Sequence, residues 1–553
     1  LATDAFLNCG SIKNWDIHLL TKNYVGRMLE HWEKTLCGND KELYRSLFHM
    51  ILFATASGGM DLNAAAAPEL AEDVDRILRS PACREILGNS SGLYGDLLLP
   101  LKPDYIGEFL FLQYLSELFP MRKRQAFLNA LYVKPMEFAA FFAKCVQDFA
   151  HAEMFCPLFQ NILEAIRPMC PTAESYAAYA SMVMSISMTC KYGEINTYAA
   201  VLEKLLYEPL IKESAYFLYT GVCFLKVLLH MTYIDGYDVI PSAELSRIAE
   251  QRKASIPCIL EKMWAVCRLF GDKDTMLIPV YAEALANYSI YGTYQEAEAC
   301  AEKLHRLYTK YTAAQSRISL YYAMALNNIL FKLSLSPSSS QERLAEGTLA
   351  KIAKLYKKHA QNLKKPGAVS IAIVNAISAP ELRESADEQI QQFSAMMNVQ
   401  RAIAVEYAKA LNNITSTYAQ NSSKEAFRHF RTLKKLYIRH KTDQPLVMVE
   451  YAKSMVALII ICSKEDADRL VHTLSELRDS CVENKAIYDL MTVRYAKLLS
   501  NRLAIAVSRE ESGEGVDQAF DEMTRICRQP DCSQILQLYF INALHHRFIL
   551  QFK

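Results

Sequence analysis

The side chains best suited to chemistry in this 553-residue chain do not form the patterns that most enzymes use. Its 15 cysteines include no C-x-x-C pair, and no H-E-x-x-H phrase occurs. Cys527 and Cys532, followed by His545-His546, match zinc spacing poorly. A phosphate loop is also missing, because Gly58-Gly59 is not followed by Lys and Ser or Thr. We therefore expect no catalytic, metal or cofactor-binding residues and no ATP hydrolysis by this chain.

Basic residues form a repeated pair in the second half of the chain. In three segments that contain Leu-Tyr, the residue before Leu and the residue three beyond it are basic, so the pair shares one helix face. The six residues, called here the basic ridge, are Arg306, Lys310, Lys354, Lys358, Lys435 and Arg439. The net charge is +5 over residues 341–365 and +6 over 424–441, but −2 over 464–485. The ridge is either a solvated helix face or a docking site for an acidic protein surface, with nucleic acid as a third interpretation.

The elements that would position this ridge repeat along the chain. The phrase Tyr-Ala-x-Ala-Leu-x-Asn begins at Tyr281, Tyr322 and Tyr407, and weaker copies begin at Val369, Tyr451, Tyr495 and Phe540. Successive copies lie 38 to 47 residues apart, which predicts one helical hairpin per repeat, stacked on its neighbours. Within the phrase, Tyr, Ala and Leu fall on one helical stripe, where the small Ala lets another backbone approach. We expect the recurrent Asn to bond a neighbouring helix or turn rather than a ligand.

Composition supports an almost wholly helical, all-α protein. The chain has only 18 Gly and 18 Pro, and 51% of its residues are hydrophobic. Its net charge of +1 argues against a general field for nucleic acid or membranes. Cysteines at apolar helical positions indicate reduced thiols and a cytoplasmic location. The most apolar long run, 217–234, contains Lys226 and His230 and is expected to be a core helix rather than a membrane span.

Three regions are predicted. Residues 1–119 contain a helix at Lys41–Ala56, a Gly58-Gly59 turn, a helix from about Ala67 and an extended run at Leu97–Leu101, which is the outline of a winged-helix module. Residues 120–275 are irregular helical repeats, and residues 276–553 are a regular α-solenoid of helical hairpins. Because the chain starts with Leu, we also expect it to be cut from a longer polypeptide.

The phrase from Leu99 to Phe111 carries a family resemblance. It contains Pro103, Asp104, Gly107 and Glu108 in the order Pro-Asp-x-x-Gly-Glu. This phrase resembles the one that closes the winged-helix part of bacterial STAND-type NTPases, and the repeats that follow look like the tetratricopeptide-like sensors of antiviral members. A structural interpretation is also open, since Asp104 and Glu108 suit the first turns of a helix.

The resemblance implies a sensor region that binds a foreign protein, such as a phage structural or packaging protein, and triggers homo-oligomerisation of the parent protein. ATP and Mg²⁺ would then belong only to a separate upstream NTPase domain. A general tetratricopeptide-like scaffold for host proteins and a nucleic-acid-binding solenoid are the alternatives. An upstream phosphate loop would distinguish the sensor from the scaffold, and steep salt dependence would favour nucleic acid.

Overall fold

The structure is a computed structural model that describes the chain in stretches. The described residues are 17–38, 40–61, 71–81, 93–94, 97–98, 100–101, 104–117, 128, 132, 134–152, 155–167, 171–190, 192–233, 243–270, 276–335, 339–362, 383–511, 513–528 and 532–552. Within them the chain is almost wholly helical, as its composition predicts, apart from one small sheet. Packing divides the chain into two compact units, Leu1–Gly271 and Asp272–Lys553.

The first part of the first unit packs helices beside a small sheet. The helices are α2 (Ile17–His31), the π-helical turn η2 (Trp32–Leu36), α3 (Lys41–Ala56), α4 (Ala71–Leu78) and α6 (Asp104–Glu117). The strands β1 (Met60–Asp61), β2 (Leu93–Tyr94) and β3 (Leu97–Leu98) pair antiparallel in the order β1-β3-β2. The predicted helix at Lys41–Ala56 is confirmed, and the predicted extended run supplies β3. The Gly58-Gly59 turn is confirmed by positive φ angles of 74° and 124°.

The rest of the first unit is a series of packed helices. They are α8 (Pro135–Phe149), α9 (Cys156–Ile166), α10 (Ala173–Ser187), α11 (Tyr192–Leu206), α12 (Pro209–Lys212), α13 (Phe217–Met231) and α14 (Ala243–Leu269). The apolar run expected to be a core helix forms α13, which contacts α10, α11 and α14. Among the described residues, no helix is both long and apolar enough to span a membrane.

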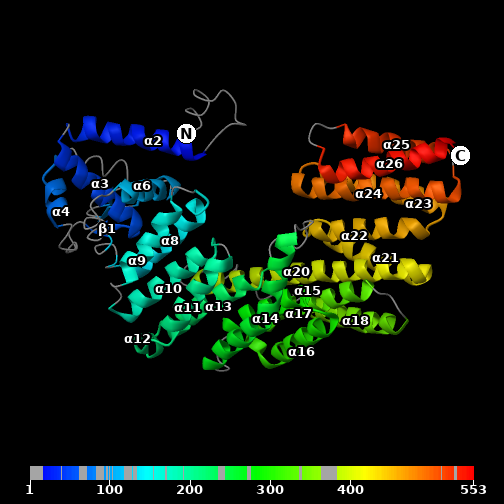
Figure 1. Ribbon diagram of the computed structural model, residues 1–553, viewed down its shortest axis with the longest axis horizontal. Coiled ribbons are helices and arrows are strands. Elements are labelled where there is room, and N and C mark those ends of the chain that lie inside the picture. The colour runs from blue at the N-terminus through cyan, green and yellow to red at the C-terminus, as the bar shows by residue number, and fades with distance from the viewer. Residues whose placement is uncertain are drawn as a thin grey trace. The chain divides into compact units, whose positions relative to one another are not determined.

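The second unit consists of helices stacked in chain order (Figure 1). Helices that carry the Tyr phrase are called A helices: α15 (Leu277–Tyr291), α17 (Gln315–Ser334), α20 (Arg383–Asn421), α22 (Pro445–Leu458), α24 (Lys485–Arg509) and α26 (Gln534–Phe552). The helices between them are called B helices: α16 (Tyr294–Lys310), α18 (Ser339–Asn362), α21 (Ser423–His440), α23 (Lys464–Asp479) and α25 (Glu514–Cys527). Short 3-10 turns, η7 (Thr312–Ala314) and η9 (Ile459–Ile461), join some of them. Each A helix contacts the next A helix along the stack.

Local sequence explains where the helices start. α15 ends at Tyr291, Gly292 is extended, and the Thr293 side chain accepts a hydrogen bond from the Glu296 backbone N–H at 3.3 Å. The Glu296 carboxylate in turn accepts from the Thr293 N–H at 2.6 Å, which completes a capping box. Ser463 caps α23 through the Asp466 N–H. The turns before α16 and α23 therefore contain residues that cap the following helix.

The fourth residue of the Tyr phrase lies inside the stack. Ala284, Ala325 and Ala410 are fully buried, in agreement with the small residue predicted there. The recurrent Asn joins neighbouring A helices: Asn328 Nδ2 donates to Ser289 Oγ at 2.8 Å and Asn413 Nδ2 to Asn327 Oδ1 at 3.0 Å. The structural role expected for this Asn is confirmed at these positions.

One predicted repeat cannot be compared with the structure in this way. The weak copy that begins at Val369 lies outside the described residues. The A helix α17 packs directly against α20, so the stack continues between the copies at Tyr322 and Tyr407. α20 is also longer than its neighbours, at 39 residues.

Replacing Ala325 with Phe is expected to lower the free energy of unfolding of the second unit by about 1–3 kcal/mol, because the buried site has no room for a ring. Ala299→Phe, on an exposed position of α16, is the matched control and should change stability by less than about 0.5 kcal/mol. Chemical denaturation followed by circular dichroism measures both. Equal midpoints for the two variants would show that Ala325 does not mark a close helix contact.

Candidate functional site

The basic ridge lies on three B helices of the second unit. Arg306 and Lys310 are on α16, and Lys354 and Lys358 are on α18. The third pair is on α21, and all six side chains are exposed. The structure therefore places the predicted pairs on successive B helices.

Lys358 and Arg439, each the second residue of its basic pair, bond to a tyrosine on the preceding B helix. Lys358 Nζ donates to Tyr308 Oη at 2.8 Å and lies 4.9 Å from the centre of that ring. Arg439 Nη1 donates to Tyr356 Oη at 3.4 Å in the equivalent position of the next repeat. Lys310 lies 5.2 Å from the centre of the Tyr311 ring. This side of the ridge therefore has a structural role besides its charge.

The first member of each pair is freer to meet a partner. Arg306 is 3.7 Å from Glu302, an exposed pair one turn away that contributes little stability. Lys354 and Lys435 form no ion pair or hydrogen bond with any other residue in the described part of the chain. All three side chains are exposed at the surface.

A groove opens next to Arg306 between α16 and α18. Its volume is about 520 Å³, and its floor consists of Tyr322, Leu326 and Ile329 from α17. Around the floor the groove is lined by charged residues and one histidine: Glu298, Glu302, His305, Arg306, Arg343 and Lys351. A groove with an apolar floor and a rim of mixed charge is typical of sites that bind a side chain of a partner.

Gly347 forms part of the wall of this groove. A Cβ atom added at Gly347 would meet no atom within 4 Å, so packing inside the chain does not require glycine there. A glycine inside a helix costs about 1 kcal/mol relative to alanine. Its position leaves the groove open to a close approach from outside.

The corresponding space between α18 and α21 is bridged by the chain's own residues. Arg428 Nη2 donates to Glu346 Oε1 at 2.6 Å, and His429 Nε2 lies 2.8 Å from the same oxygen. The bond to His429 is the main cause that lowers the pKa of Glu346. Glu346, Glu425 and His429 are close enough to share a cation, but the Arg428 guanidinium already binds both carboxylates. Of these two spaces between B helices, the one between α16 and α18 is therefore the more open.

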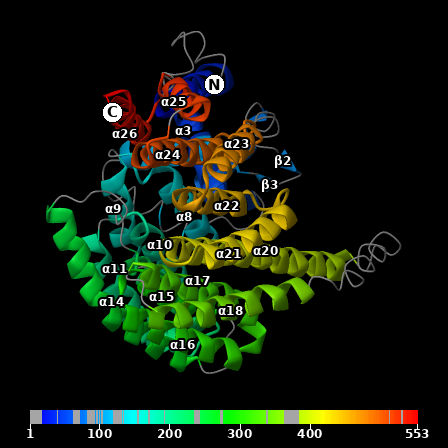
Figure 2. The same ribbon diagram turned by 90° about the vertical axis from the view of Figure 1, so that its right-hand side faces the viewer.

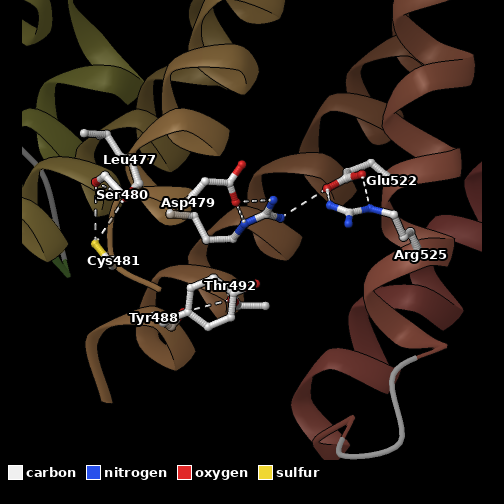
Figure 3. A network of polar contacts seen from close by, with 9 residues as sticks. Leu477, Asp479, Ser480, Cys481, Tyr488, Thr492, Glu522 and Arg525 are labelled. Atoms are coloured by element: carbon white, nitrogen blue, oxygen red, sulfur yellow. Dashed lines mark hydrogen bonds and ion pairs between the residues drawn. The ribbon is translucent and has the colours of Figure 1, made fainter. Parts of the chain in front are cut away.

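A second cavity, of about 510 Å³, lies between α23, α24 and α25 beside buried Arg478. Arg478 Nε and Nη2 donate to Asp479 Oδ1 at 2.8 and 2.7 Å, and Nη1 donates to Glu522 at 3.1 Å (Figure 3). Its guanidinium lies 4.6 Å from the Tyr495 ring centre. Arg525, seen beside Glu522 in Figure 3, lowers the pKa of Glu522 by hydrogen bonding to it. The charges here satisfy one another, which favours a structural role.

The Arg478 network is not part of the basic ridge, but one feature of the repeated sequence marks it. Leu477-Arg478 stands where α16, α18 and α21 have Leu-Tyr, as in Leu436-Tyr437. The ring of Tyr437 stacks on Tyr451 of the next A helix with centres 5.2 Å apart, and Arg478 takes the same place against Tyr495. An arginine at a repeat position that holds tyrosine in α16, α18 and α21 is the feature that could have identified it.

The family phrase of the first unit is only partly described, because Pro103 lies outside the described residues. Asp104 is the first residue of α6 and pairs with Lys144 at 3.2 Å. A Cβ atom on Gly107 would lie 2.7 Å from Thr55 Cγ2, so glycine allows α6 to approach α3. Glu108 is buried, and burial, followed by a hydrogen bond with Asp148, raises its pKa to about 7. Glu108 therefore lies near the start of α6, where the structural interpretation of the phrase places it, and the structure adds that its carboxyl is buried.

The remaining sequence candidates do not form a reactive centre in the described residues. His49 on α3 has its Nδ1 3.2 Å from Asp73 and its Nε2 hydrogen-bonded to Tyr114, so both ring nitrogens are engaged by residues of the first unit. Cys527, Cys532, His545 and His546 do not converge into a three-ligand group among the described residues. One catalytic pattern does occur, contrary to the expectation that the chain lacks them: residues 88–92 read Gly-Asn-Ser-Ser-Gly, which has the G-x-S-x-G spacing, and they lie outside the described residues.

Comparisons with protein-family models, curated proteins and solved structures find no match to this chain. The described residues therefore define the structural class of the protein and not its family. It is a helical protein whose second unit is a stack of A and B helices.

Proposed function

We propose that this chain is the protein-binding sensor region of a STAND-type NTPase. In this proposal the second unit is an α-solenoid of tetratricopeptide-like hairpins, and the A and B helices that contact one another in chain order support it. The first part of the first unit would be a winged-helix module, in which α3, α4 and α6 accompany the β2–β3 hairpin. The family assignment itself rests on the resemblance of the Pro-Asp-x-x-Gly-Glu phrase.

The ligand would bind the B-helix face, and one observation carries this proposal. The α16–α18 groove is open along Gly347, whereas Arg428 and His429 bridge to Glu346 across the corresponding space between α18 and α21. Lys354 and Lys435 extend the positive charge along the same set of helices. An acidic protein segment fits this combination of apolar groove and basic surface.

The partner would be a foreign protein, such as a phage structural or packaging protein, and its binding would trigger oligomerisation of the parent protein. The chain itself would act by binding rather than catalysis, with ATP and Mg²⁺ held by a separate NTPase domain. A protein partner is favoured over nucleic acid because the apolar floor of the groove, formed by Tyr322, Leu326 and Ile329, suits an apolar side chain beside the acidic residues of the partner. A general host scaffold would use the same surface, and the identity of the partner distinguishes the two.

The association rate constant of the double variant Lys354→Glu/Lys435→Glu for its acidic partner is expected to be at least about tenfold lower than that of the unmodified chain, because surface charges act mainly on the association rate. Gly347→Trp should abolish binding by filling the groove, whereas Gly347→Ala should bind normally because its Cβ meets open space. Biolayer interferometry against purified phage structural and packaging proteins, host proteins and duplex DNA measures each variant.

Lys358→Glu is the contrasting variant, because it also breaks the contact with Tyr308 and should lower stability. Equal binding by Gly347→Trp and the unmodified chain would exclude the groove. Binding of DNA alone, falling steeply with added salt, would replace the protein partner with nucleic acid.

A further inference from the structure

Lysine occupies the third position of the Tyr phrase in three successive A helices. Lys409 is on α20, Lys453 is on α22 and Lys497 is on α24. These helices pack one against the next along the stack (Figures 1 and 2). The three lysines therefore occupy equivalent positions on neighbouring helices, so their surroundings can be compared directly.

The first two of these lysines are neutralised by a glutamate that stands just before the Tyr of the same phrase. Lys409 Nζ donates to Glu406 Oε1 at 2.7 Å, and Lys453 Nζ donates to Glu450 Oε1 at 2.6 Å. Both glutamates are buried. A buried carboxylate is costly unless it is paired, so each of these ion pairs belongs to the scaffold of the stack.

An asparagine of the preceding A helix completes each of these two groups. Asn327 Nδ2 donates to Glu406 Oε2 at 3.2 Å, and Asn412 Nδ2 donates to Glu450 Oε2 at 3.4 Å. Both asparagines are the sixth residue of their Tyr phrase. The same group of Asn, Glu and Lys therefore occurs where α17 meets α20 and where α20 meets α22.

The third contact, between α22 and α24, lacks two members of this group. Arg494 occupies the position of the glutamate in α24, and Val456 occupies the position of the asparagine in α22. Neither Arg494 nor Lys497 forms an ion pair or hydrogen bond with another residue in the part of the chain that the structure describes. A contact that is charge-balanced in the two earlier copies therefore carries two uncompensated cations here.

A pocket of about 310 Å³ lies at this third contact, with walls from α20, α22, η9 and α24. Its polar lining includes Lys453, Arg494, Lys497, Asn412 and Asn501, and none of the described residues around it is Asp or Glu. The Nε atom of Arg494 is buried and has no hydrogen-bond partner among the described residues. Because buried donors are nearly always paired in native proteins, the pocket suits a ligand that supplies acceptor oxygens.

The charge and the size of this pocket favour a phosphate group. Because Glu450 balances Lys453, the net excess is the two charges of Arg494 and Lys497, which match the charge of about −1.5 to −2 on a phosphomonoester at pH 7. An arginine fork can bind two phosphate oxygens and leave a third for lysine. A single carboxylate would leave one cation uncompensated. The volume of about 310 Å³ is at the lower end for ligand pockets, so it suits a phosphate end rather than a whole nucleotide.

We propose that Arg494 and Lys497 form a binding site for a phosphomonoester group between α20, α22 and α24. Free phosphate and a phosphorylated side chain share this chemistry. The site lies on A helices, whereas the proposed partner groove lies between the B helices α16 and α18. It therefore does not depend on the proposed function.

Isothermal titration calorimetry of the full chain with inorganic phosphate and with N-acetyl-phosphoserine amide tests this site. Saturable binding is expected, and Arg494→Glu should abolish it, because the new carboxylate can pair with Lys497 as Glu450 pairs with Lys453. This variant should keep the fold, since glutamate is the residue that α20 and α22 have at this position. Lys485→Glu, an equal change of charge at an exposed position of α24, is the matched control and should bind normally.

Lys497→Gln removes one charge without adding another and should weaken phosphate binding about tenfold or more. Circular dichroism checks that each variant keeps its helical content. Tighter binding of the phosphoserine compound would assign the site to a phosphorylated side chain, and tighter binding of inorganic phosphate would assign it to the free ion. The proposal would be overturned by a chain that binds neither compound, by equal affinity of the Arg494→Glu chain, or by equally tight binding of N-acetyl-aspartate amide.

Discussion

Glu511→Ala is expected to lower the free energy of unfolding of the second unit by about 3–5 kcal/mol. Arg502 is fully buried, and its Nη1 donates to Glu511 Oε2 at 2.7 Å. Its Nε bonds Asp468 at 2.9 Å, while Nη2 has no hydrogen-bond partner among the described residues. Removing Glu511 would leave two of the three guanidinium nitrogens unpaired in the interior and only Asp468 to balance the buried charge, which is costly.

Arg502→Met should cost less than Glu511→Ala, because it removes the buried charge and leaves carboxylates that can still reach water. Glu483→Ala, at an exposed turn, is the control and should be nearly neutral. Because the chain has two compact units, hydrogen exchange of α24 during denaturant titration measures the right transition. A loss below about 1 kcal/mol for Glu511→Ala would show that Arg502 is solvated or repaired by another group.

The stability of the first unit should fall as the pH rises from about 4.5 to about 7, through the ionisation of Glu108. Burial raises the pKa of this carboxyl to about 7, so its neutral form is stabilising below about 4.5 and is lost as the pH passes 7. One pKa unit corresponds to about 1.4 kcal/mol, so the full effect is about 3 kcal/mol. Asp148 and Asp104 act in the same direction as burial, and Lys144 opposes them.

Glu108→Gln should remove this part of the pH dependence and make the first unit more stable at pH 8 than the unmodified chain. Glu137→Gln, at an exposed site on α8, is the control and should leave the slope unchanged. Denaturant midpoints measured across pH 4–8 for the three chains provide the comparison. An equal slope in the Glu108→Gln chain would mean that Glu108 does not ionise within this range.

Sequence periodicity alone determined the helical character and the ends of many elements. Ala and Leu recur in the Tyr phrase because each repeat must bury the same stripe, and Thr293 with Glu296 marks a helix start through local bonds. These signals are readable because the interactions act between residues close in the chain or repeat at a fixed spacing.

The tertiary structure decided which of the repeated residues are bonded to another helix and which are exposed. Lys354 and Lys358 look alike in sequence, yet Lys358 is bound to Tyr308 about 50 residues away and Lys354 is not. Likewise Leu499 and Leu544 occupy the same phrase position, and only Leu544 is exposed, because nothing in the described chain packs beyond α26. Exposure depends on which neighbours arrive from distant repeats, a property that one repeat does not encode.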